Sequence, residues 1–134
     1  LIDYYIVEIR ENGVTGDIRQ HYLAVYTKVK FLVRKAAFCN TNCVFNCWED
    51  IETVTLPSGE IVNRVSPMLP AKIKQQVCGL CNIVGYVTSA NDSKGNRQWY
   101  FITEGNPTVM AKDQMFLRKN CRPEDLFKAP EKKN

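Results

Sequence analysis

The chain has 134 residues, 45% of them hydrophobic, and a formal net charge of +4. This length and composition suffice for one ordinary domain with a buried core, so folding does not require cross-links. No apolar run approaches the ~20 residues of a membrane-spanning helix, so no membrane partner is expected. We expect one β domain over residues 1–128 and a solvated tail at 129–134.

The first half of the chain is rich in residues that favour strands. Tyr4–Glu11 is aromatic and β-branched and runs into the turn formers Asn12-Gly13, which predicts a strand and a turn. Tyr22–Phe38 fits two periods. As a helix it has apolar residues at heptad-like spacing, and as a strand it separates Phe31 and the valines from the basic residues. Its density of Val, Thr, Tyr and Phe favours one long strand.

The second half alternates short strands and turns. Glu52–Leu56 and Ile61–Val65 flank a turn and predict a small hairpin, and Pro67 and Pro70 then interrupt regular structure. A second pair of strands is predicted at Ile83–Ser89 and Gln98–Thr103, with Asn91–Asn96 as the turn. Beyond them, Thr108–Lys119 has helical composition and predicts the one short helix near the C-terminus.

Charge is unevenly distributed along the chain. Residues 23–48 contain four bases and no acid, whereas residues 49–63 contain four acids and no base. The bases are Lys28, Lys30, Arg34 and Lys35. A basic segment beside an acidic one favours an anionic partner, although a solvated face gives the same pattern.

Two close cysteine pairs dominate the middle of the chain. Cys39 and Cys43 have three residues between them, and Cys78 and Cys81 have two. Each pair can supply two thiolates from one tight turn, so we expect these four cysteines to bind a structural zinc ion. Cys47 and Cys121 remain outside this set. Six cysteines also allow three disulfides, which would make the protein extracellular, and a redox-active Cys-x-x-Cys is a further alternative.

Catalytic motifs are lacking in the sequence. It contains no glycine-rich phosphate loop, nucleophile elbow or paired His-Glu metal motif. His21 is the only histidine, and a Cys–His catalytic pair stays open, but a solvated or packing role is the simpler interpretation. We therefore do not expect an enzyme.

The order of these features resembles a known family. A strand, a zinc ribbon at about residues 39–81 and an aromatic strand follow one another over residues 6–105. This order is similar to the zinc-bearing oligonucleotide-binding fold at the C-terminal end of the large subunit of replication protein A. The likeness is carried by Ile6–Asn12, Val29–Leu32, Ala37–Cys43, Val77–Cys81, Tyr86, Asn96–Trp99, Phe101 and Glu104.

The resemblance implies a fold, a partner and a location. The fold would be mainly β, an OB-like or related small antiparallel barrel with an inserted zinc ribbon. The partner would be single-stranded DNA or RNA, with protein subunits of a larger complex, in the nucleus or another intracellular compartment. Basic residues would contact phosphates and aromatic residues would stack on bases. These residues are Lys28, Lys30, Phe31, Arg34, Lys35, Trp48, Arg97, Trp99 and Tyr100. The alternative is a secreted, disulfide-bonded β protein that binds a partner protein.

Overall fold

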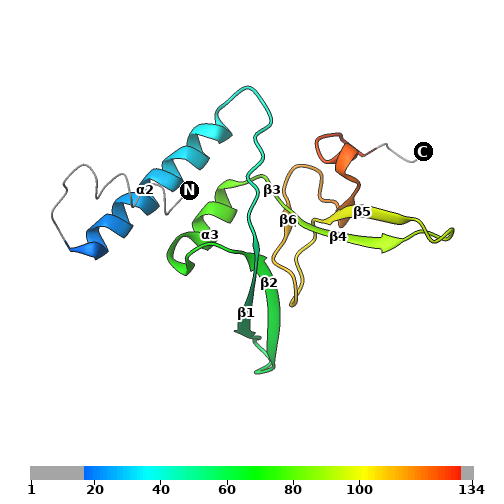
Figure 1. Ribbon diagram of the computed structural model, residues 1–134, viewed down its shortest axis with the longest axis horizontal. Helices are drawn as coiled ribbons and strands as arrows, with labels where there is room; N and C mark the ends of the chain where they lie inside the picture. Colours follow the sequence, from blue (N-terminus) through cyan, green and yellow to red (C-terminus); the bar gives the residue numbers. More distant parts are fainter. Residues whose placement is uncertain (1–16, 131–134) are drawn as a thin grey trace. The chain divides into compact units, whose positions relative to one another are not determined.

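The computed structural model describes residues 17–130, so the strand expected at Tyr4–Glu11 lies outside the described part (Figure 1). The chain divides into two compact units. Among the described residues, the helical unit consists of 17–43 together with Pro70–Leu80, and the sheet unit consists of Val44–Leu69 and 81–130. The sequence predicts one domain over residues 1–128, and the two units lie within that range or overlap it. The single domain stays a prediction.

The helical unit contains α2 (Ile18–Ala37) and α3 (Ala71–Leu80), which pack against each other. The carboxylate of Asp17 caps α2 by accepting a hydrogen bond from the backbone N–H of Arg19 at 3.0 Å. Val25, Val29 and Val33 recur every four residues along α2 and are buried, which places one apolar stripe toward the core. Ile73 and Val77 of α3 are buried in the same way.

The long strand expected over Tyr22–Phe38 is therefore wrong, because this segment is helical. Strand propensity of valine and threonine is a weak local preference of about 1 kcal/mol or less per residue, and packing of an amphipathic stripe overrides it. The valines that favoured a strand by composition are the residues that form the stripe. The sequence also gave no sign of α3, which begins directly after Pro70, whose carbonyl oxygen accepts from the N–H groups of Ile73 and Lys74.

The first hairpin of the sheet unit pairs β1 (Glu49–Thr55) with β2 (Ile61–Pro67), and this confirms the predicted hairpin. Gly59 has a φ of 85° in the turn, a conformation that favours glycine. Across the strands, Arg64 and Glu52 form an ion pair at 2.7 Å. On its other edge β2 bonds at Val65: its N–H donates to the carbonyl oxygen of Thr108, and its carbonyl oxygen accepts from the N–H of Met110, both at 2.8 Å.

The second predicted hairpin is also confirmed, but the single strand expected at Ile83–Ser89 is divided between two sheets. In the hairpin, β4 (Tyr86–Asn91) pairs with β5 (Arg97–Ile102), and β7 (Asn120–Cys121) adds to β5. The carboxylate of Asp92 accepts from the N–H groups of Lys94 and Asn96 and shapes the turn. A third, two-stranded sheet joins β3 (Ile83–Val84) to β6 (Lys112–Asp113).

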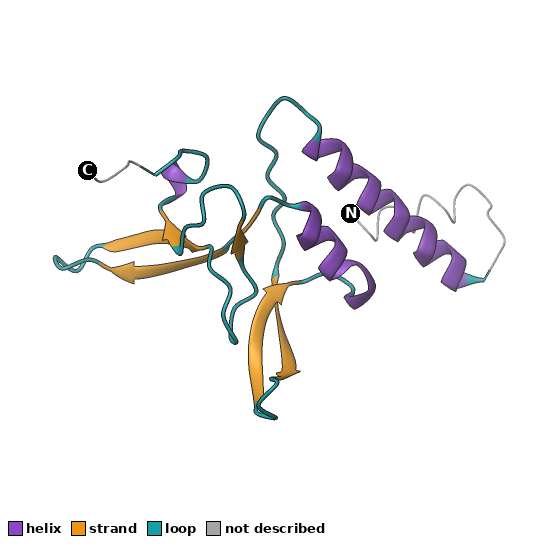
Figure 2. Cartoon of the chain, turned by 180° about the vertical axis from the view of Figure 1, so that it is seen from behind, coloured by secondary structure: helices purple, strands orange, loops and turns teal. Residues whose placement is uncertain are grey.

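Between residues 17 and 130 the architecture is thus mainly β, with small antiparallel sheets and two α-helices, as expected in outline (Figure 2). The described strands form three separate open sheets and do not close into a barrel. A short 3-10 helix, η1 (Pro123–Asp125), follows β7.

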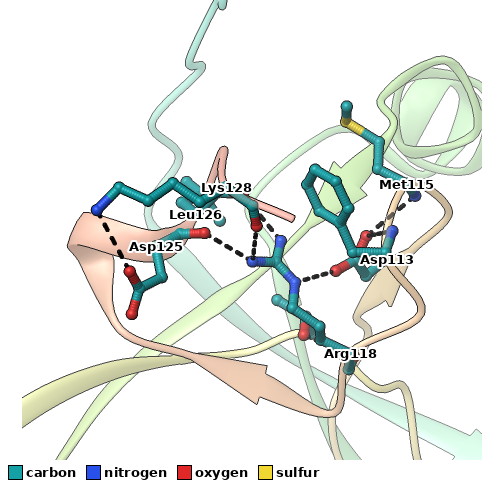
Figure 3. Close-up of polar contacts among 8 residues, drawn as sticks. Asp113, Met115, Arg118, Asp125, Leu126 and Lys128 are labelled. Atoms are coloured by element: carbon teal, nitrogen blue, oxygen red, sulfur yellow. Dashed lines mark hydrogen bonds and ion pairs between the residues drawn. The ribbon is translucent and has the colours of Figure 1, made fainter. Parts of the chain in front are cut away.

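The helix expected over Thr108–Lys119 is wrong, and one aspartate accounts for the difference. Asp113 accepts hydrogen bonds from the N–H groups of Met115 and Phe116, which turns the chain locally in place of helical pairing (Figure 3). Its second oxygen accepts from Nε of Arg118 at 2.7 Å. The guanidinium of Arg118 also donates to the carbonyl oxygens of Asp125 and Leu126, and so ties this turn to the segment around η1.

Candidate nucleic-acid interface

The predicted contact residues of the basic segment all lie on α2, and together they are called the basic face here. The helix contains no acidic residue between Ile18 and Ala37. The side chain of Phe31 is 57% exposed, and the ammonium group of Lys35 lies 5.2 Å from the centre of its ring. The basic face consists of Lys28, Lys30, Phe31, Arg34 and Lys35.

The change from strand to helix alters which side chains are neighbours. On a strand, Phe31 would face away from Lys28 and Lys30, because alternate residues point to opposite sides. On a helix, residues three and four apart lie side by side. Phe31 is therefore adjacent to Lys28, Arg34 and Lys35, and an exposed aromatic ring stands among cations. The buried valine stripe occupies the other side of α2.

A second group of predicted residues lies in the sheet unit. Arg97 and Trp99 are two residues apart on β5 and share one face of the strand. The guanidinium of Arg97 lies 4.7 Å from the centre of the Trp99 ring, and its Nε donates to the hydroxyl of Ser89 at 2.9 Å. Trp99 is 51% exposed, whereas Tyr100 is half-buried. This pair is an exposed cation–π contact held in place by the neighbouring strand.

Trp48 lies just before β1 and is exposed. Its carbonyl oxygen accepts a hydrogen bond from the N–H of Met68 at 2.7 Å. The structure thus gathers the predicted contact residues into two groups, one on α2 and one on β5, with Trp48 separate from both. The α2 group belongs to the helical unit, and the others belong to the sheet unit.

The six cysteines are free thiols. Cys39 and Cys43 follow α2, while Cys78 and Cys81 lie at the end of α3 and just after it. Within residues 17–130, no group of three or more His, Cys, Asp or Glu side chains is arranged to hold a metal ion. The zinc site therefore stays a prediction.

Cys47, which the zinc prediction left out, has an electrostatic connection to that set. Burial raises the pKa of the Cys81 thiol, nearby Lys112 lowers it, and Cys47 raises it. The pKa of Cys47 is itself raised by burial. Cys47 thus acts on the Cys81 thiol, and a raised pKa keeps both thiols protonated at neutral pH. The sequence offered no signal for this relationship, since the two residues are far apart along the chain.

His21 lies on the same side of α2 as the valine stripe, four residues before Val25. Its Nε2 is buried and has no hydrogen-bond partner in the described part of the chain. Within residues 17–130, no thiol therefore pairs with Nε2 of His21.

Comparison with known proteins places the chain in a family. A family model described as AAA domain matches residues 7–115, which is more than half of the sequence. The chain belongs to the AAA domain family. No curated protein and no solved structure gives a significant match. The matched range includes α2, α3 and both hairpins of this AAA-family chain.

The sequence of this AAA-family chain lacks one motif of nucleotide-binding domains. The phosphate-binding loop of P-loop nucleoside triphosphatases, Gly-x-x-x-x-Gly-Lys-Ser/Thr, does not occur among the 134 residues. The described helices also lack the combination of length and apolar composition that crossing a bilayer requires. The resemblance to the replication protein A domain is not tested by these comparisons and stays a prediction.

Proposed function

We propose that this chain is the nucleic-acid-binding portion of an AAA-family ATPase, and that it contacts single-stranded DNA or RNA through the basic face of α2. The observation that carries the proposal is the exposed ring of Phe31 beside Lys35, on a helix without any acidic residue. Phosphates would contact the flanking cations, and a base would stack on the ring.

The electrostatics of the helical unit support this proposal. From Asp17 onward its described residues include Arg19, Lys72 and Lys74 in addition to the cations of the basic face, and Asp17 is the one acid among them. Such a concentration of one sign raises the local concentration of a polyanion and speeds its association. Stacking of a base on an aromatic side chain contributes about 1–3 kcal/mol and tolerates any base sequence.

The Arg97–Trp99 pair is a second element of the proposal. An arginine against the face of an exposed tryptophan offers a cation for phosphate and a ring for a base at one point of β5. The hydrogen bond from Arg97 to Ser89 holds the guanidinium in position before any ligand arrives. We include Trp48 as a further exposed ring, without a basic partner assigned to it.

The proposal also includes one structural zinc ion. Its ligands would be Cys39, Cys43, Cys78 and Cys81, which follow or end the two helices that pack together. Cys39 donates its thiol proton to the carbonyl oxygen of Lys35 at 3.3 Å, and metal binding would require loss of that proton. Metal analysis with a free-thiol count decides this point: one zinc per chain is expected, and metal-free protein with six reactive thiols would remove it. An OB barrel is not required, because the contacts proposed here lie on a helix and a hairpin.

The test is binding of a fluorescently labelled oligothymidylate, followed by anisotropy at several salt concentrations. The affinity should fall with salt with a log–log slope of about 0.7 per phosphate contact on single strands. Replacing both Arg34 and Lys35 with Ala should weaken binding and lower this slope by about 1 to 1.5. Phe31→Ala should weaken binding roughly 5- to 150-fold with little change of slope.

Two variants serve as matched controls. Leu23→Ala removes an exposed apolar side chain from the same helix, eight residues from Phe31, and Lys94→Ala removes an exposed base at the β4–β5 turn. Both should bind like the original chain. The proposal fails if binding is absent or independent of salt, or if the Phe31 and Arg34/Lys35 variants bind as well as the controls.

A further inference from the structure

The part of the β4–β5 hairpin nearest its turn is a two-stranded ribbon with both faces open in the described structure. The third strand of this sheet, β7, pairs only with the last two residues of β5, so toward the turn β4 and β5 pair with each other alone (Figure 1). The segment Ser89–Trp99 is called the free ribbon here. From Ala90 onward every residue of it except Asp92 is exposed. Open faces on both sides leave the free ribbon available to a partner.

The charges of the free ribbon suit an anionic partner. Lys94 in the turn and Arg97 on β5 are exposed cations. Asp92 is the one acid of the ribbon, and its carboxylate is used within the turn, where it accepts the backbone N–H groups of Lys94 and Asn96, both at 2.9 Å. The charges that remain available to a ligand are therefore positive.

The other polar side chains of the free ribbon indicate which polyanion it fits. The register places Asn91 directly opposite Arg97 on one face, and Gln98 lies on the other face of β5. The side chains of Asn, Gln and Arg make paired hydrogen bonds to base edges in the major groove of DNA, and this groove admits a two-stranded ribbon. The major groove of duplex RNA is deep and too narrow for side chains to read. The free ribbon therefore fits a B-form DNA duplex.

Trp99 lies at the end of the free ribbon far from the turn and suits a different part of a nucleic acid. It is 51% exposed, and the guanidinium of Arg97 lies 4.7 Å from the centre of its ring. Trp99 is four residues from Gly95 in the turn, which is about 13 Å along a strand. This length equals about four stacked base pairs. An aromatic ring of this kind stacks on a base whose face is open, as in a single strand.

We propose that the free ribbon binds the junction between a single strand and a B-form DNA duplex. Its turn lies in the major groove of the last base pairs, where Lys94 contacts a phosphate and Asn91 contacts a base edge. Trp99 stacks on the first unpaired base, with Arg97 beside it. This inference rests on the proposed function and narrows its ligand from any single strand to a junction.

The test compares labelled ligands by anisotropy at one salt concentration. They are an oligothymidylate, a blunt DNA duplex, that duplex with a 3′ or 5′ oligothymidylate overhang of the same length, and an RNA duplex with the same overhangs. One of the two DNA junctions should bind at least about tenfold more tightly than the oligothymidylate, the blunt duplex and the RNA junctions.

The double variant Asn91→Ala with Lys94→Ala should remove this preference, because it takes away one base contact and one phosphate contact. Its affinity for the oligothymidylate should be unchanged. Asn63→Ala removes an exposed amide from the other hairpin, on β2, and should keep the preference. The substituted side chains are exposed, so circular dichroism and the urea midpoint of each variant should match those of the original chain.

Equal affinity for the DNA junctions and the oligothymidylate would overturn this inference and leave the proposed function standing. A blunt duplex or an RNA junction bound as tightly as the DNA junction would overturn it as well. A preference that survives the double variant would assign the duplex contact to another part of the chain, which also overturns it. Absence of binding to every ligand would overturn the proposed function and this inference together.

Discussion

The carboxylate of Asp113 lies 2.7 Å from Nε of Arg118, and the two side chains are only 0% and 10% exposed. The pair is almost fully buried, and its remaining hydrogen-bonding groups are used: Asp113 accepts two backbone N–H groups, and Arg118 donates to carbonyl oxygens around η1. Each side chain therefore neutralises the buried charge of the other.

Replacing Arg118 with Met should lower the free energy of unfolding by about 3–5 kcal/mol, because the substitution leaves the Asp113 carboxylate buried without its cation. Urea denaturation at pH 7 measures this. Lys119→Ala is the control at the neighbouring position: its ion pair with Glu104 is exposed and 3.6 Å long, so its loss should cost less than about 1 kcal/mol. Equal effects of the two substitutions would contradict a special role of the buried pair.

The stability of the protein should fall in acid partly through Asp113. Burial alone would raise the pKa of this carboxyl, but hydrogen bonds from Phe116, Arg118 and Met115 and the charge of Arg118 outweigh it, and the pKa is lowered. Its contribution is thus complete above the ordinary aspartate pKa of about 3.9 and is lost as pH falls through the lower folded value.

The free energy of unfolding measured between pH 7 and pH 2 tests this point. It should decline below about pH 4 in the original chain and decline less in Asp113→Asn, which has no carboxyl to protonate. A residual decline is expected from Asp92, whose pKa is lowered by hydrogen bonds from Asn96 and Lys94. If the Asn variant loses stability with acid as steeply as the original chain, protonation of Asp113 is not involved.

Among the described residues, Ile73 of α3 has the largest fully buried apolar side chain, and Ile73→Ala should destabilise the helical unit by about 2–5 kcal/mol. Loss of helical circular dichroism on heating or in urea reports on this unit, since α2 and α3 are its elements. Ile61→Ala removes the same atoms from an exposed position on β2 and should change stability by about 0.5 kcal/mol or less. A small effect at Ile73 would mean that α2 and α3 do not share a packed core.

Two glycines should respond to alanine in opposite directions. A Cβ on Gly105 would lie 2.5 Å from the carbonyl oxygen of Ala111, so Gly105→Ala forces the backbone apart and should cost about 1–3 kcal/mol. Gly79 is in α3, and a Cβ there meets no atom within 4 Å. Gly79→Ala should therefore stabilise the protein by up to about 1 kcal/mol. Thermal midpoints of both variants give the signs.

The sequence predicted the two hairpins because their turns are determined locally. Gly59 and Asp92 act within a few residues of their own positions, and the flanking strands have β-type composition. The prediction of a strand at α2 was wrong because the choice between strand and helix depends on whether the valine stripe packs against an apolar partner. That partner is α3, some forty residues away, which the sequence did not indicate.

The residues of the candidate interface were chosen from the sequence and their role in binding stays a prediction, whereas their arrangement comes from the structure. Phe31 and the bases around it were selected for type alone, and only the helix makes the ring and the cations neighbours. The Arg97–Trp99 contact could be expected from the sequence more directly, because residues two apart lie on the same face of any strand. The helix expected at Thr108–Lys119 failed because composition does not reveal that the Asp113 side chain binds two backbone N–H groups.

The guanidinium of Arg118 donates only to main-chain atoms of the segment around η1. The acceptors are the carbonyl oxygens of Asp125, Leu126 and, at 3.4 Å, Lys128. Every amino acid has a carbonyl oxygen, so the guanidinium recognises the path of this segment and not the identity of its side chains. Related chains should therefore keep an arginine and an aspartate at positions 118 and 113 while positions 126 and 128 diverge. The backbone of the segment around η1 is therefore restrained, while its side chains are free to vary.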